Sequence, residues 1–102
     1  MAARRRASPC AERESAVSPY RVAPGVHWVV GRTALTILDG NGAAKTLGYP
    51  EAAVWDFVTR GYSLCDVSRL IAPVASLDPP AARQVVQAAV DGWIASGFLE
   101  RA

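Results

Sequence analysis

The sequence is poor in the residues on which most enzyme sites depend. Its 102 residues include one histidine, His27, and two cysteines, Cys10 and Cys65. The cysteines lack the paired spacing of a zinc or redox site, so we expect Cys10 to be a thiol in the N-terminal arm and Cys65 a small core residue. His27 stands alone in an apolar stretch, which favours a structural role. No catalytic triad, paired carboxylates or phosphate loop is recognisable, so we expect no enzyme activity, no cofactor and no metal.

Long apolar runs are also missing. No stretch approaches the ~20 apolar residues that a membrane span requires, and the N-terminal arginines are not followed by the apolar segment of a secretory signal. We therefore expect a cytoplasmic protein that does not bind a membrane. Hydrophobic residues still make up 51% of the chain, which is enough for the core of one domain.

The positive charge is confined to the start of the chain. Residues 1–19 hold four arginines against two glutamates, whereas residues 20–102 hold seven basic and seven acidic side chains. We expect residues 1–19, which are rich in Arg, Ala, Ser and Pro, to form a disordered basic arm, and residues 20–102 to form the folded domain. A DNA-binding domain usually carries its basic charge on the fold itself, so this neutral balance argues against a nucleic-acid partner.

Three strands are expected in the first half of the domain. The segment Tyr20–Val30 is rich in β-branched and aromatic residues and predicts a first strand that is kinked at Pro24-Gly25. The alternating segment Thr33–Leu38 predicts a second. Asp39–Gly42, with two glycines and an asparagine, is a strong hairpin signal, after which Ala43–Tyr49 returns as the third strand.

Three helices are expected after the strands. Pro50–Arg60 begins with a proline and an acidic residue, both favourable in a first turn. Ser63 is a suitable N-cap for a second helix, which we expect to end at Pro73, and Pro79-Pro80 opens a third. The order β-β-β-α-α-α predicts an α+β fold of the winged helix-turn-helix type, in which a three-stranded antiparallel sheet precedes three helices.

Several of these features also occur in the order found in one known family. They are Pro24-Gly25 before the first strand, the hairpin Asp39–Gly42 ahead of Leu47, a helix that carries Ala52-Ala53 and Trp55 and ends at Gly61, a Ser-initiated helix with Val67, and the closing Gly97-Phe98-Leu99. Through this set, which covers about residues 20–99, the chain resembles the PqqD-like family of RiPP recognition elements. It departs from the family at Gly48, where an asparagine is frequent, and at Trp93, where an aliphatic residue is usual.

The resemblance implies a non-catalytic peptide-binding domain. Members of this family bind the leader segment of a ribosomally synthesised precursor peptide and present it to a modifying enzyme, often a radical SAM protein. The leader adds as a strand to the third β-strand and lies against the third helix.

The residues themselves are compatible with strand addition. Ala43–Leu47 contains no proline and only one charge, on Lys45, so this sheet edge is poorly protected against pairing. On the third helix and its exit we assign four residues mainly to the core: Val85, Ala89, Trp93 and Phe98. The predicted peptide-binding residues are Ala43, Ala44, Lys45, Thr46 and Leu47 on the strand and Arg83, Val86, Gln87 and Val90 on the helix.

Two other functions remain open at this stage. A winged-helix protein that binds DNA would need polar and basic residues along an exposed helix face, for which the third helix offers Arg83, Gln84 and Gln87. A scaffold that bridges subunits without recognising a peptide would need neither.

Overall fold

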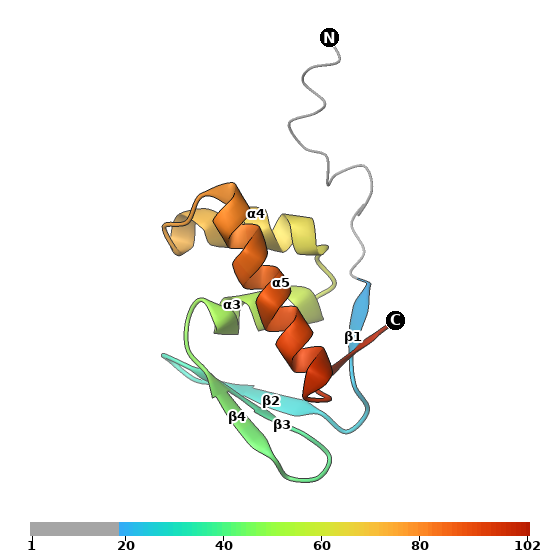
Figure 1. The fold of residues 1–102 in the computed structure, drawn as a ribbon. Coiled ribbons are helices and arrows are strands. Elements are labelled where there is room, and N and C mark those ends of the chain that lie inside the picture. The colour runs from blue at the N-terminus through green and yellow to red at the C-terminus, as the bar shows by residue number, and fades with distance from the viewer. Residues whose placement is uncertain (1–18) are drawn as a thin grey trace.

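A computed structural model describes residues 19–102 and has an α+β architecture (Figure 1). The predicted three-stranded antiparallel sheet followed by three helices is present, together with a second, two-stranded sheet. The elements are β1 (Tyr20–Val22), β2 (His27–Val30), β3 (Leu35–Leu38), β4 (Ala44–Leu47), α3 (Glu51–Thr59), α4 (Leu64–Val74), α5 (Pro79–Ala95) and β5 (Leu99–Arg101). The expected disordered arm, residues 1–19, lies outside the described residues except for Pro19. Cys10 therefore lies outside them too.

The three-stranded sheet is organised around the predicted hairpin. Its strand order is β2-β3-β4, with Ile37 opposite Lys45 in the β3–β4 pair. The Asp39 carboxylate accepts hydrogen bonds from the backbone N–H groups of Asn41 at 2.8 Å and Ala43 at 2.9 Å. Gly42 has a φ of 89°, a conformation that glycine adopts without the steric cost paid by other residues. The hairpin therefore forms where its turn residues predict it.

The first predicted strand is wrong in one respect, because Tyr20–Val30 forms two strands in different sheets. Gly25 lies between them with a φ of 83°, and a Cβ at this position would come within 3.3 Å of the Cα atom of Gly40. The chain turns at this glycine, and β1 leaves the main sheet to pair antiparallel with β5. The predicted exit segment at Phe98-Leu99 thus leads directly into a strand that joins the two ends of the domain.

Local signals determine where the helices begin and end. The Ser63 hydroxyl accepts a hydrogen bond from the Asp66 N–H at 3.1 Å, and the Asp78 carboxylate accepts one from the Ala81 N–H at 2.9 Å. These are N-caps of α4 and α5. Cys65, in the first turn of α4, is buried as predicted. No helix in residues 19–102 is both long and apolar enough to cross a membrane.

All three tryptophans of the chain meet in one row. Trp55 of α3 is fully buried and lies edge-to-face with Trp28 of β2, at 5.5 Å between ring centroids, and with Trp93 of α5, at 5.1 Å. Such aromatic pairs contribute about 0.5–1.5 kcal/mol each beyond the burial of their surface. The row joins the sheet to α3 and α5, which lie on the same side of it (Figure 1). This packing places α5 beside β4.

Candidate functional site

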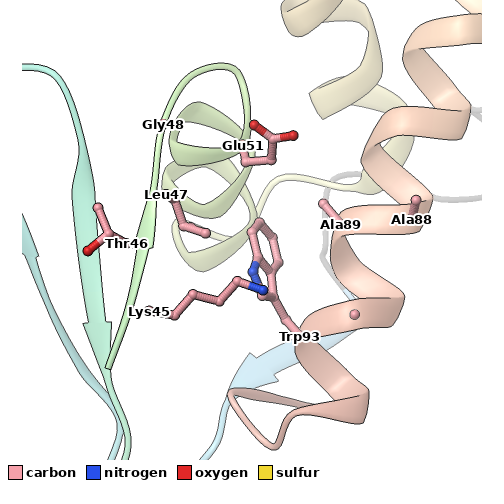
Figure 2. A pocket seen from close by; sticks show the side chains of 9 residues that line it. Lys45, Thr46, Leu47, Gly48, Glu51, Ala88, Ala89 and Trp93 are labelled. Atoms are coloured by element: carbon pink, nitrogen blue, oxygen red, sulfur yellow. The ribbon is translucent and has the colours of Figure 1, made fainter. Parts of the chain in front are cut away.

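The strand β4 is an edge of the three-stranded sheet, because β3 is its only partner among the described strands. Side chains alternate between the two faces of a strand. Lys45 and Leu47 point to the helical side, as Figure 2 shows. Ala44 and Thr46 point to the outer face, where the Thr46 hydroxyl lies 3.2 Å from that of Thr36 on β3.

The register of the β3–β4 pair decides which backbone groups face the open edge. Asp39 donates its N–H to the Ala43 carbonyl at 2.9 Å. Asp39 and Ala43 are therefore a hydrogen-bonded pair, and along an antiparallel ladder every second pair is of this kind. The next two such pairs are Ile37 with Lys45 and Leu35 with Leu47, so the backbone groups of Lys45 and Leu47 point toward β3. The N–H and C=O groups of Ala44 and Thr46 therefore point to the open side. They are spaced to pair with one further strand.

A recess lies between this edge and α5. Its volume is about 310 Å³, which is near the lower end of the ~300–1,000 Å³ that small-molecule pockets occupy. The lining residues are Lys45, Thr46, Leu47, Gly48, Glu51, Ala88, Ala89, Gly92 and Trp93 (Figure 2). Apart from Trp93, the helix contributes only alanine and glycine here, so a bound chain can come close to the helix backbone.

The predicted strand residues lie at this edge. Ala44–Leu47 form β4, and Ala43 precedes it directly. Ala43, Ala44, Lys45 and Thr46 are exposed, whereas Leu47 is buried at the floor of the recess. Their part in peptide binding stays a prediction.

The orientation predicted for α5 is corrected by the burial of its residues. Val86 and Val90, predicted to face a peptide, are 1% and 0% exposed and belong to the core. Ala89, assigned mainly to the core, is half-buried and lines the recess; Val85 is also only half-buried. Trp93 and Phe98 are buried as predicted. Adjacent helical residues point about 100° apart. Because both members of the pairs Val85-Val86 and Ala89-Val90 are apolar, the sequence does not show which member of each pair faces the core.

The remaining predicted helix residues lie elsewhere. Arg83 and Gln87 are exposed and line a second recess of about 140 Å³ between α4 and α5, together with Leu64 and Cys65. The structure therefore does not bring them together with β4 in one recess.

The sequence reasoning missed the residues that α5 does contribute, above all Ala88 and Gly92. Small residues lining a groove carry no polar or hydrophobic signal. Gly92 offers a faint one, because glycine inside a helix costs about 1 kcal/mol relative to alanine. A Cβ at Gly92 would meet nothing within 4 Å, so packing within the chain does not require a glycine there.

His27, the one histidine of the chain, does not line this recess. His27 is exposed on β2. Among residues 19–102, no group of three or more His, Cys, Asp or Glu side chains is placed to hold a metal ion. What the site offers is an open strand edge next to a recess that is lined by small, apolar and charged residues.

Comparison with known proteins establishes the fold. No protein-family model and no curated protein matches this chain. Two solved structures are similar to it. One, lasso peptide synthetase B1 complexed with the leader peptide, has a TM-score of 0.75 and 19% identity, covering 81% of this chain and 99% of that one. The other, TbiB1 in complex with the TbiA(beta) leader peptide, has a TM-score of 0.73 and 15% identity, covering 78% and 94%.

Proposed function

We propose that this chain is a RiPP recognition element, which binds the leader segment of a ribosomally synthesised precursor peptide and presents it to a modifying enzyme. The observation that carries the proposal is the open edge of β4 beside the recess on α5. The chain's role is binding, and the partner enzyme carries out the chemistry.

Strand addition explains how both halves of the site are used. The leader's backbone pairs with the outward N–H and C=O groups of Ala44 and Thr46, which supplies affinity for any extended chain. Every second side chain of the leader then points toward the recess, where its fit against Leu47 and Trp93 supplies specificity. An interface of this kind is below about 1,200 Å². We expect a Kd between about 1 μM and 1 nM, which corresponds to roughly 8–12 kcal/mol.

The two similar structures support this proposal because each is a complex with a leader peptide. Their likeness extends over nearly the whole length of those chains, so the entire domain that holds a leader there has its counterpart here. A lasso-peptide precursor is accordingly the first leader to test. The modifying enzyme is then a lasso synthetase subunit or, as the PqqD-like resemblance suggests, a radical SAM protein.

The rival function, DNA binding by a winged helix, has little support in the charges of the helices. Arg69 of α4 is ion-paired with Asp66 at 2.9 Å. On α5, Gln87 donates a hydrogen bond to the Asp91 carboxylate at 2.9 Å, and this acid lies on an exposed face that DNA would require to be basic.

The test is a titration of the ¹⁵N-labelled full chain with a synthetic lasso-precursor leader peptide, followed by amide NMR. We expect saturable shifts at Ala44–Leu47 and Ala88–Trp93, with small changes in α4. A 20-base-pair duplex DNA serves as the competing ligand. Saturable DNA binding without any response to leader peptides would overturn the proposal.

A further inference from the structure

Two opposite charges flank the recess. Lys45 lines it from β4, and Glu51 lines it from the first turn of α3. In Figure 2 the Lys45 side chain extends toward Trp93, while the Glu51 carboxylate lies on the far side of Leu47. Both charged residues are exposed, so both are available to a bound chain.

Neither charge is used within the described part of the chain. Residues 19–102 contain seven Asp and Glu side chains, and six of them have polar partners. Asp56, Asp66 and Glu100 are ion-paired with arginines, Asp39 and Asp78 accept backbone N–H groups, and Asp91 accepts a hydrogen bond from Gln87. Glu51 is the exception among these residues. Lys45 likewise has no carboxylate within 4.0 Å in this part of the structure.

Each charge has an ordinary explanation when it is taken alone. An acidic residue in a first turn stabilises a helix through the helix dipole, which accounts for Glu51. A lysine on an edge strand hinders unwanted pairing, which accounts for Lys45. Neither explanation accounts for the position of both residues, unpaired and of opposite sign, on the walls of the same recess.

We infer that the recess selects peptides by the positions of their charged side chains. The inferred ligand is an extended segment with an acidic side chain beside Lys45 and a basic side chain beside Glu51. An apolar side chain between them lies over Ala88, Ala89 and Gly92. This inference rests on the proposed strand addition, because side chains of a paired strand enter the recess at every second position. Complementary charges at the rim of a binding site select partners and fix their register more than they add affinity.

The experiment is a selection from a displayed library of random 12-residue peptides on the full chain. The wild type is expected to enrich peptides that carry one acidic and one basic residue around an apolar position. Lys45→Glu is expected to replace the enriched acid by a base and to weaken binding of the wild-type peptides about three- to tenfold. Glu51→Lys is expected to replace the enriched base by an acid. Lys45→Met, which keeps the apolar stem, is expected to lose the preference for an acid without reversing it.

Arg32→Glu is the matched control, since Arg32 is exposed in the β2–β3 turn and does not line the recess. It changes the net charge as Lys45→Glu does, and it is expected to leave the enriched pattern unchanged. Circular dichroism and NMR spectra check that each variant is folded.

The outcomes separate this inference from the proposed function. If the wild type and Lys45→Glu enrich β4-binding peptides with the same charge pattern, selection by charge is overturned and strand addition is left intact. A wild-type chain that enriches no peptide would overturn both. Reversal by Arg32→Glu as well would mean that net charge, and not the recess, sets the pattern, which also overturns the inference.

Discussion

Trp93 packs edge-on against Trp55, with ring centroids 5.1 Å apart and ring planes at 86°. The same Trp93 lines the recess between β4 and α5. One indole therefore belongs both to the core and to the candidate binding surface. A peptide in the recess would rest against a side chain whose position is fixed by the centre of the domain, so little ordering of that wall is needed on binding.

Trp93 is expected to matter first for stability. We expect Trp93→Ala to lower the free energy of unfolding by about 3–5 kcal/mol, because it removes a 2%-exposed side chain and leaves a cavity beside Trp55. Trp93→Phe keeps an aromatic ring at this position and is expected to cost clearly less. Urea denaturation followed by far-UV circular dichroism measures both. An alanine variant as stable as the wild type would show that Trp93 is not part of the core.

Gly92 separates binding from stability. We expect Gly92→Ala to raise the free energy of unfolding by about 0.5–1 kcal/mol, since alanine is the better helix former and its Cβ meets nothing within 4 Å. Gly92→Leu is expected to fill the recess and to weaken leader binding at least tenfold in a domain that still folds. Gln84→Leu, at an exposed position on the same helix outside the recess, is the control. Equal weakening by both leucines would argue against the recess as the site.

Thr46 tests strand addition directly. Its N–H points to the open edge, so Thr46→Pro removes a donor that no described strand uses, and proline is tolerated at such edge positions. We expect this variant to fold and to lose most of its affinity for the leader. Lys45→Pro is the contrasting change, because it removes an N–H that bonds to β3 and is expected to destabilise the sheet. The measurement is leader affinity by isothermal titration, with thermal unfolding alongside. Unchanged affinity in a folded Thr46→Pro domain would exclude pairing along β4.

Gly25 is expected to be irreplaceable at its turn. Gly25→Ala forces a side chain into a φ of 83° and within 3.3 Å of the Gly40 backbone. We expect a loss of at least about 1 kcal/mol of stability. Gly42→Ala is the useful comparison, because Gly42 has a similar φ of 89° but open space around its Cα. A smaller loss at Gly42 would isolate the cost of the close approach, and equal losses would assign the whole effect to backbone conformation.

The features that could be predicted from the sequence are those specified by neighbouring residues. Asp39–Gly42 forms a turn because the Asp39 carboxylate accepts backbone N–H groups and the segment has two glycines. Ser63 begins a helix because its hydroxyl accepts a hydrogen bond from the N–H three residues later. The rotation of α5 could not be predicted in this way. Val86 is buried and Val85 is not fully so, and only the packing of Trp93 on Trp55 decides between them. The pairing of β1 with β5 was missed because it joins residues about 80 positions apart.

The same limit applies to the candidate site. A strand edge with a single charge could be recognised from residues 43–47, since edge strands usually carry more protection. The helix wall opposite it could not, because Ala88 and Gly92 act by being small. A residue that makes room leaves no trace in a hydrophobic pattern.

The antiparallel pairing of β1 with β5 has a practical consequence for the design of fusion proteins. Tyr20 lies opposite Arg101, and the Ala102 N–H donates to the Pro19 carbonyl at 2.9 Å, so both ends of the domain leave it at one place (Figure 1). The open edge of β4 belongs to the other sheet. A linker attached at either end can therefore join this domain to a second protein while the linker residues next to the domain stay away from the open edge of β4. For the same reason a circular permutant that joins residues 19 and 102 and opens the chain in the α4–α5 loop is geometrically feasible.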